Sequence, residues 1–182
     1  YSSPTPFIHS SYYNDEMGTP LLKCFVSFIH LWNPQYIYKT KLRTQSIENK
    51  YAKASQRQLN LDPGYLTHYQ VSLLSTKNFA HRLPLQLGIY AELTLLYQHN
   101  TYSFLPWTYP DFKFENTLEY LTQLRYTYSS QIKNKRYKTI YVISSCARCV
   151  RDVGKRPIAL VSIKHVGTDP FVAVRRDDQP LE

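Results

Sequence analysis

The stretch NLDPGYLTHYQVSLLSTKNFAHR, residues 60–82, holds the clearest turn signal of the chain and one of its clearest strand signals. Residues 62–65, DPGY, are typical of a tight turn, because proline fixes φ at the second position and glycine accepts a positive φ at the third. Residues 71–77 then form a run that is typical of a strand. We therefore predict a turn followed by a strand here, within a fold that is built on a sheet.

Two more strands are expected directly after this turn and strand, at residues 81–87 and 89–97. In the second, alternate residues are apolar, and such side chains share one face of a strand. Glu92 alternates with them and is therefore expected on the opposite face, away from the core. Arg82 alternates in the same way with the leucines that follow it. Both charged residues are thus predicted on polar faces of the sheet.

The rest of the front part predicts one more strand and two helices. Residues 22–31 form an apolar run that is typical of a strand. Asn33 followed by Pro34 is a helix start, and the helix is expected to run to about Tyr51. A second helix is predicted from Glu115 to Lys133, because its apolar residues follow a helical stripe. Together these elements predict an α+β fold, in which a mainly antiparallel sheet packs with two principal helices.

The composition changes near Asn134. Residues 1–134 contain two Val and 15 Tyr, whereas residues 135–182 contain seven Val and two Tyr. We therefore predict a motif-bearing α+β domain over 1–134. Residues 135–182 are expected to be a basic, β-rich extension or a tail that is not native to the domain.

The overall composition restricts the classes of function. The net charge of +9 favours anionic partners, RNA among them, although a diffuse excess of positive charge is also common elsewhere. No apolar run is suited to crossing a membrane, and three cysteines are too few for a disulfide framework, so we expect a cytoplasmic protein without a membrane partner. The sequence indicates no oligomeric state.

No motif identifies a cofactor or a metal. The patterns GxxxxGK[ST], GxGxxG, HExxH and GxSxG do not occur, which removes the usual support for P-loop, dinucleotide-binding, zinc-protease and serine-hydrolase chemistry. Cys146 and Cys149 form a lone CxxC, which fits two unpaired thiols better than a zinc or redox site. The cofactor therefore stays unknown, and no metal ligands are predicted.

Charged residues that can bind anions and transfer protons gather in and after the opening stretch. They are Asp62, Lys77, His81, Arg82, Glu92 and Asp111. Lysine and arginine would bind a phosphate or carboxylate, while His81, Glu92 and Asp62 would be the catalytic acid and base groups. The alternative is that Arg82 with Glu92, and Lys77 with Asp62, form ordinary surface ion pairs. Trp107, Tyr109 and Asp111 lie in the loop LPWTYPDF, which could stack a base or sugar or could cap a core.

Five motifs, taken in order along the chain, indicate a resemblance to a protein family. They are YYNDEMG (12–18), NLDPGYL (60–66), STKNFAHR (75–82), GIYAELTL (88–95) and PWTYPDF (106–112). Over about residues 5–133 the chain resembles prokaryotic proteins known only as domain of unknown function 4416. The resemblance implies that Tyr65 and Tyr90 belong to the ligand-binding positions, together with Lys77, Arg82, Trp107, Tyr109 and Asp111.

The chain also departs from the pattern of that family. Asn78 stands where members usually have aspartate after the lysine of the third motif, which removes a candidate base or metal ligand. Members usually begin with a further strand and helix, and the resemblance therefore implies that this domain lacks that unit.

Two classes of function follow from these residues. The first is a site for an anionic small molecule, phosphorylated or nucleotide-like, with acid/base or phosphoryl chemistry as an option. The alternative is a non-catalytic module that binds RNA or a protein, which the charge and the 15% aromatic content would suit. Whether the protein is an enzyme stays open at this point.

Overall fold

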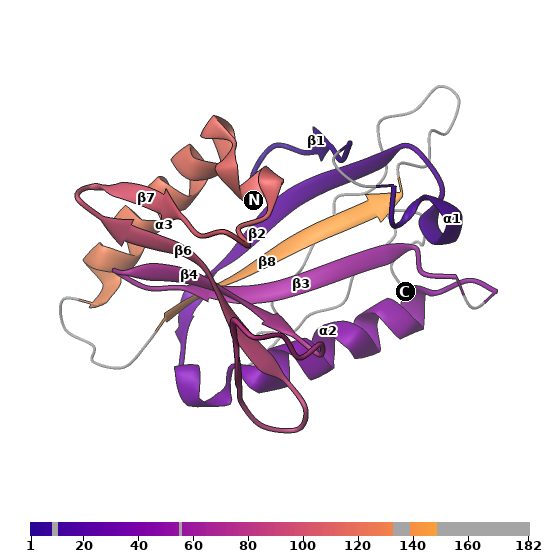
Figure 1. Ribbon diagram of the computed structural model, residues 1–182, viewed down its shortest axis with the longest axis horizontal. Helices are drawn as coiled ribbons and strands as arrows, with labels where there is room; N and C mark the ends of the chain where they lie inside the picture. Colours follow the sequence, from indigo (N-terminus) through magenta and orange to yellow (C-terminus); the bar gives the residue numbers. More distant parts are fainter. Residues whose placement is uncertain (9–10, 55, 133–138, 149–182) are drawn as a thin grey trace, which may run out of the picture.

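A computed structural model describes residues 1–8, 11–54, 56–132 and 139–148, the last of these by their backbone alone. Figure 1 shows the arrangement of the elements. Eight strands form one sheet in the order β1-β2-β8-β3-β4-β6-β5, with β7 paired to β6, and every pairing is antiparallel. The strands are β1 (Thr5–Pro6), β2 (Leu21–Trp32), β3 (Leu59–Leu66), β4 (Gln70–Ser75), β5 (Arg82–Pro84), β6 (Tyr90–Gln98), β7 (Thr101–Phe104) and β8 (Thr139–Arg148).

Two principal helices pack with the sheet, α2 (Tyr38–Tyr51) and α3 (Glu115–Ile132). Shorter helical turns are α1 (Asn14–Met17), η1 (Pro34–Tyr36) and η2 (Pro110–Lys113). The side chain of Asn33 accepts a hydrogen bond from the Gln35 backbone N–H at 3.0 Å and so caps η1, as the sequence predicts. The α+β prediction is confirmed: an antiparallel sheet packs with two main helices.

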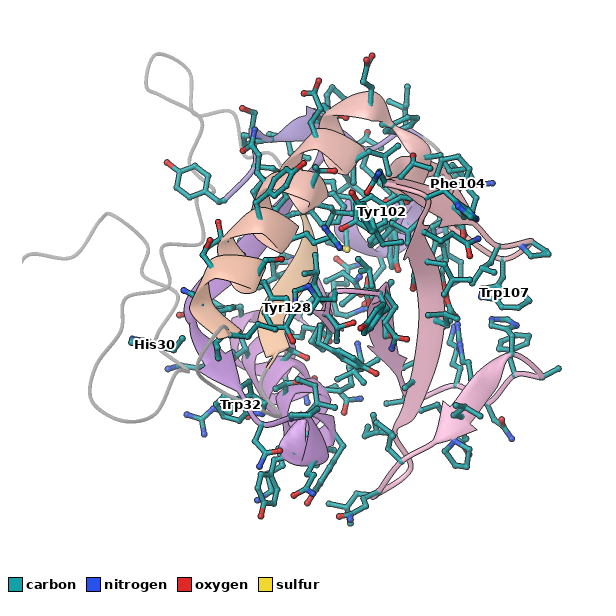
Figure 2. The ribbon with its side chains drawn as sticks, turned by 90° about the vertical axis from the view of Figure 1, so that its left-hand side faces the viewer. His30, Trp32, Tyr102, Phe104, Trp107 and Tyr128 are labelled. Carbon is teal, nitrogen blue, oxygen red and sulfur yellow. The ribbon has the colours of Figure 1, made fainter. Side chains whose placement is uncertain are left out.

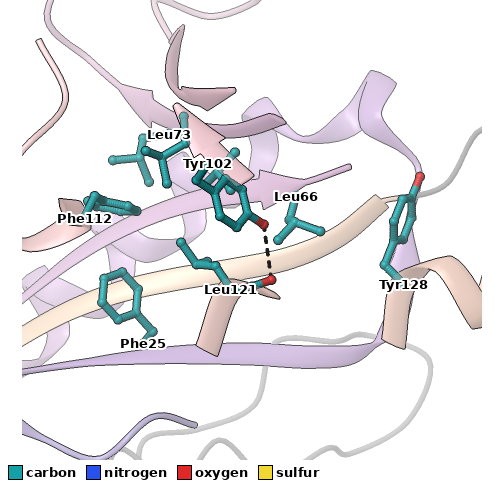
Figure 3. Packing of buried hydrophobic residues seen from close by; sticks show 9 residues of the cluster. Phe25, Leu66, Leu73, Tyr102, Phe112, Leu121 and Tyr128 are labelled. Atoms are coloured by element: carbon teal, nitrogen blue, oxygen red, sulfur yellow. Dashed lines mark hydrogen bonds between the residues drawn. The ribbon is translucent and has the colours of Figure 1, made fainter. Parts of the chain in front are cut away.

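The core is divided between the two faces of the sheet. Leu73 and Leu74 are neighbours on β4, so their side chains point to opposite faces. Leu73 belongs to a cluster that includes Leu121 of α3, and within it the Tyr102 hydroxyl donates to the Leu121 carbonyl oxygen at 3.2 Å (Figure 3). Leu74 belongs to a second cluster, against which Ile47 of α2 packs. Each principal helix therefore covers its own face.

The turn predicted at residues 62–65 is wrong, because these residues lie inside β3. Gly64 is required there for a close approach of two strands and not for a positive φ. A Cβ atom at Gly64 would lie 2.3 Å from the carbonyl oxygen of Ser72 on β4. Pro63 is tolerated because the pairing of β3 with β4 begins only at Gly64.

The prediction that Glu92 points away from the core is also wrong, and a β-bulge explains the error. Val71 pairs with Leu95, but the next residue of β4, Ser72, pairs with Leu93, so Thr94 is an extra residue in β6. An extra residue reverses the alternation of side chains. Glu92 then lies opposite Leu73 and shares the face of Leu95, and it is 2% exposed.

The remaining boundaries follow the predictions in part. The strand expected at 81–87 is only three residues long, because the chain turns after Pro84 and the Leu85 N–H donates to the Ile89 carbonyl oxygen. The strand β8 begins after the expected boundary at Asn134, yet it lies in the same sheet between β2 and β3. The division of the chain into 1–134 and 135–182 stays a prediction. Cys149 lies outside the described residues. Among the described helices, none is both long and apolar enough to cross a membrane.

Candidate functional site

A pocket lies where β3 and β4 separate. The two strands pair over three residues each, Gly64–Leu66 with Val71–Leu73. Beyond this short ladder β3 pairs only with β8, and β4 only with β6, so the sheet opens between them (Figure 1). A cavity of about 520 Å³ is lined by Asn60 and Asp62 of β3 and by the end of β4. This volume lies within the range of small-molecule sites.

Charged and aromatic side chains dominate the wall of this pocket. The cationic ones are Lys23, Lys41, Arg57, Lys77 and Arg82, and the acidic ones are Glu48, Asp62, Glu92 and Asp111. The aromatic ones are Phe7, Tyr12, Tyr13, Tyr109 and Phe112. Among the described residues no group of three or more His, Cys, Asp or Glu could hold a metal ion.

Glu92 is the most deeply buried charge in the wall, and two basic side chains contact one of its oxygens. Arg82 Nε donates to Glu92 Oε2 at 2.7 Å, and His81 Nε2 lies 3.1 Å from the same atom. Arg82 also donates from Nη1 to Ser75 Oγ at 2.9 Å and from Nη2 to the Tyr109 hydroxyl at 3.3 Å. Hydrogen bonds from Arg82 therefore link the end of β4 to β6 and to the loop before η2.

His81 lies behind this wall and does not line the pocket. Its ring stacks on Trp107 with centroids 4.6 Å apart and an interplanar angle of 13°, and Phe79 lies on it at 5.9 Å. The Trp107 indole N–H donates to the Leu93 carbonyl oxygen at 2.7 Å, which fixes the ring against β6. In Figure 2, Trp107 lies on the far side of β6 from Tyr128 of α3. The loop with Trp107 thus holds His81 in position against Glu92.

The second oxygen of Glu92 has no hydrogen-bond partner among the described residues. Oε1 is buried, whereas the contacts of Glu92 with Arg82 and His81 are both made by Oε2. A buried acceptor without a partner costs about 1–3 kcal/mol, so such groups are rare in folded proteins.

A chain of polar contacts crosses the opposite wall. Arg57 donates to both carboxylate oxygens of Glu16, at 2.7 and 2.6 Å, and its Nη1 donates to Asn60 Oδ1 at 3.1 Å. Asn60 Nδ2 in turn donates to Asp62 Oδ2 at 2.7 Å. Lys41 Nζ, on α2, reaches Asp62 Oδ1 at 3.5 Å. The hydrogen bonds from Arg57 lower the pKa of Glu16 and, in return, raise the pKa of Arg57.

Glu48 is a buried acid in the same wall. Burial raises the pKa of its carboxyl group above the ordinary value, and the Leu61 N–H and the nearby Lys41 only partly oppose this. One oxygen, Oε1, accepts a hydrogen bond from the Leu61 backbone N–H. The other oxygen accepts no hydrogen bond from the described part of the chain. The Glu48 carboxyl group is therefore protonated more readily than that of an exposed glutamate.

A second buried ion pair lies where η2 meets β2. Lys23 of β2 contacts Asp111, and both side chains are almost fully buried. The Lys23 ammonium lies 5.5–5.7 Å from the ring centroids of Phe7, Phe25 and Phe112. Such a desolvated cation among aromatic rings is stabilised by cation–π attraction. Asp111 thus has a structural partner within the chain.

Lys77 differs from the other cationic side chains of the pocket. Lys23, Lys41, Arg57 and Arg82 each contact a carboxylate. Lys77 is exposed, its Nζ lies 5.4 Å from the Tyr12 ring centroid, and within the described residues it has no carboxylate partner. Its charge is therefore available to a bound anion.

Comparison with known proteins agrees with the five motifs. The model of a family described as "Domain of unknown function (DUF4416)" matches residues 1–128, which is most of the described chain. The chain belongs to this family. No curated protein and no solved structure matches the sequence. The DUF4416 match ends within α3, so β8 lies beyond it.

Each of the five motifs quoted from this sequence contributes to the pocket. The contributing residues, in motif order, are Tyr12 and Tyr13; Asn60 and Asp62; Ser75, Thr76, Lys77 and Arg82; Glu92; and Tyr109, Pro110, Asp111 and Phe112. These segments are far apart in the sequence and come from both walls. The fold thus brings the stretches that carry the family resemblance to one place.

The structure brings some of the expected site residues to the pocket and leaves others away from it. Those that line it are Asp62, Lys77, Arg82, Glu92, Tyr109 and Asp111. Those that do not are His81, Trp107, Tyr65 and Tyr90. Tyr65 packs against the core cluster on the α2 face, and Tyr90 is half-buried on β6. The expected ion pair of Lys77 with Asp62 does not form, since Asp62 contacts Lys41 instead. The expected pair of Arg82 with Glu92 does form, but it is buried and does not lie on the surface.

Three pocket residues on α2 were not predicted, namely Lys41, Gln45 and Glu48. Their spacing of four and three residues places polar side chains on one face of a helix. The sequence signal for them is the small apolar face of this predicted helix, formed by Ile37, Thr44, Ile47 and Tyr51. A helix that faces a polar pocket needs fewer apolar residues. Arg57 lies outside any predicted element and gave no signal.

Proposed function

We propose that the pocket between β3 and β4 binds an anionic small molecule that is phosphorylated or nucleotide-like. The observation that carries this proposal is Lys77, whose ammonium group faces the pocket without a carboxylate partner among the described residues. An exposed cation beside a concave, mixed polar and aromatic surface is typical equipment for binding a phosphate or carboxylate group.

Hydroxyl groups near Lys77 support the same ligand class. Ser75 Oγ accepts hydrogen bonds from Arg82 and from the Lys77 N–H, so its own proton is left to donate. Burial raises the pKa of Tyr109, and the nearby Glu92 adds to this, so its hydroxyl stays protonated. Its oxygen accepts from Arg82, and its proton is available to a ligand. An anion next to Lys77 would therefore meet a cation and two hydroxyl donors.

The same pocket holds groups for proton transfer. Glu48 has a raised pKa, and Glu92 is held by Arg82 and His81 in one orientation. We assign His81 the task of positioning Glu92, because it lies behind the wall and contacts Glu92 Oε2. Acid or base catalysis on the bound molecule would then be performed by the carboxyl groups that line the pocket.

The test is a thermal-shift screen of the full chain with inorganic phosphate, pyrophosphate and adenosine monophosphate. A ligand at a hundred times its Kd stabilises the folded state by about 2.7 kcal/mol. We expect at least one of these anions to raise Tm, and the variant Lys77→Met to lose most of the shift while its own Tm is unchanged.

Lys39→Met is the matched control for Lys77→Met. Lys39 is also exposed and its Nζ lies 4.9 Å from the Tyr36 ring centroid, but it does not line the pocket. This variant should keep the full ligand-induced shift. Equal losses in the two lysine variants, or no shift with any anion, would rule out the proposed site.

A second candidate function is binding of RNA, which one surface feature favours. The Arg125 guanidinium lies 3.7 Å from the Tyr97 ring centroid, and its Nε donates to the His68 carbonyl oxygen, next to the exposed Tyr69. An arginine and an exposed aromatic ring can each stack on unpaired bases. Filter binding to single-stranded RNA over a salt series tests this, because phosphate contacts weaken steeply as salt increases. Negligible binding at low salt would exclude it.

A further inference from the structure

We infer that the anionic ligand also carries neighbouring hydroxyl groups, as a sugar phosphate or the ribose of a nucleotide does, and that Asp62 and Glu48 bind these hydroxyls. This inference rests on the proposed function, because it assumes that an anion occupies the Lys77 side of the pocket. It specifies which functional groups the ligand carries besides its anionic group.

The two walls of the pocket differ in what they offer to a ligand. The wall formed by the end of β4 offers the Lys77 ammonium and the hydroxyl of Ser75. The wall formed by β3 and α2 offers carboxylate oxygens, from Asp62 and from Glu48. A molecule that fills the pocket would therefore present an anion to the first wall and hydrogen-bond donors to the second.

The carboxylates of the second wall have acceptor capacity left. A carboxylate has about four lone-pair sites. Glu48 is 6% exposed, lines the pocket, and accepts one hydrogen bond, from the Leu61 N–H. Asp62 accepts one short hydrogen bond from Asn60 and one long contact from Lys41, and its side chain is 40% exposed. Unused acceptors in a pocket favour a ligand that brings donors.

Hydroxyl groups fit this wall better than a second cation does. Lys41 Nζ already lies 3.5 Å from Asp62 Oδ1, and Arg57 lies beside Asn60. A positively charged ligand group would be repelled by both of these side chains. Neutral hydroxyls can donate to the carboxylates and can accept from Lys41. The rings of Tyr12 and Tyr13 also line the pocket and offer apolar surface to a sugar ring.

The experiment is isothermal titration of the full chain with inorganic phosphate, ribose 5-phosphate and 2-deoxyribose 5-phosphate. We expect ribose 5-phosphate to bind at least about tenfold more tightly than phosphate, since hydrogen bonds to charged groups contribute about a factor of ten each. The deoxy sugar should fall between the two. Equal affinities for phosphate and ribose 5-phosphate would overturn the inference.

The variant Asp62→Ala separates a hydroxyl contact from a general change in charge. Removal of an acidic group cannot weaken the attraction of an anion, so phosphate should bind this variant as tightly as before or more tightly. Ribose 5-phosphate should lose most of its advantage over phosphate. The matched control is Asp15→Ala, an exposed acid that does not line the pocket, and it should keep that advantage. An undiminished advantage in Asp62→Ala would contradict the inference.

Two further arms complete the design. Glu48→Gln keeps an acceptor for the Leu61 N–H and should also reduce the advantage of ribose 5-phosphate. Titration with adenosine monophosphate distinguishes a nucleotide from a sugar phosphate, since both carry a phosphate and neighbouring hydroxyls. If adenosine monophosphate binds more tightly than ribose 5-phosphate, the ligand is a nucleotide. If the two bind equally, the ligand is a sugar phosphate. If wild-type protein binds phosphate through Lys77 but gains nothing from the sugar, the inference fails while the proposed function stands.

Discussion

Arg82 and Glu92 lie directly opposite each other in the β5–β6 ladder, and their side chains form an ion pair that is almost fully buried. Arg82 Nε donates to Glu92 Oε2 at 2.7 Å, and the two side chains are 7% and 2% exposed. This pair joins β5, which begins at the last residue of the third motif, to β6, which begins within the fourth. It also fixes one wall of the pocket, because both residues line it.

Removal of one partner of this pair should destabilise the protein strongly. The variant Arg82→Leu leaves the Glu92 carboxylate buried with only His81, and we expect it to lower the free energy of unfolding by about 3–5 kcal/mol. The double variant Arg82→Leu, Glu92→Leu removes the stranded charge and should be more stable than the single variant. Urea unfolding measures both. A double variant that loses the sum of the two single effects would contradict this account.

Substitution of Gly64 should force β3 and β4 apart. The variant Gly64→Ala places a Cβ atom 2.3 Å from the Ser72 carbonyl oxygen, and overpacking of this kind costs about 1–3 kcal/mol. Gly88→Ala is the comparison, since a Cβ there meets no atom within 4 Å but φ is +72°, which costs a residue with a side chain about 1–2 kcal/mol. Denaturant unfolding should show the larger loss for Gly64→Ala. The reverse order would show that the close approach of the strands does not limit this position.

Glu16 should stabilise the fold at neutral pH. Its pKa is lowered from 4.5 by hydrogen bonds from Arg57, so the folded state binds its proton less readily than the unfolded state does. The stabilisation is therefore present above pH 4.5 and is lost as the pH falls through the lower pKa of the folded state. We expect Glu16→Gln to be less stable at pH 7, by at most about 1 kcal/mol because the pair is partly exposed. In acid unfolding curves the deficit should shrink as the pH falls below 4.5 and Glu16 becomes protonated.

The contribution of Glu48 to stability should change with pH in the opposite direction to that of Glu16. Burial raises the pKa of Glu48 above 4.5, so its contribution favours the folded state below that pH and is lost as the pH rises through the raised pKa. Glu48→Gln keeps the acceptor for the Leu61 N–H and removes the buried charge. Its Tm, relative to wild type, should therefore be higher at pH 7 than at pH 4. A variant that is less stable at pH 7, with a deficit that disappears in acid, would show that ionised Glu48 is well compensated.

The sequence predicted the elements of the fold better than it predicted which way their side chains point. The strand over 22–31, the helix start at Asn33 and the long helix from Glu115 depend on local signals, and all three are confirmed. The predicted face of Glu92 is wrong because the alternation of β6 is interrupted at Thr94, and a bulge depends on the partner strand. The turn predicted at Gly64 is wrong because a glycine can serve either a positive φ or a close contact between strands, and the sequence does not distinguish the two.

The candidate site was predictable only in part for a similar reason. Lys77, Arg82 and Glu92 could be predicted as neighbours because they lie within one turn and two adjacent strands. Lys41 and Arg57 lie on segments that the sequence does not relate to those strands, and only the tertiary fold places them across the pocket. The order of the strands, with β8 between β2 and β3, likewise depends on contacts far apart in the chain.

The most direct test of the proposed site is to map the bound anion by amide chemical shifts. A ¹⁵N-labelled sample of the full chain is titrated with adenosine monophosphate and, separately, with inorganic phosphate. We predict that the largest shifts fall on Ser75, Thr76, Lys77 and Tyr109, and that Arg125 and Tyr126 do not respond. Shifts confined to the surface around Arg125, or no shifts with either anion, would contradict the proposal that the opening between β3 and β4 is an anion-binding pocket.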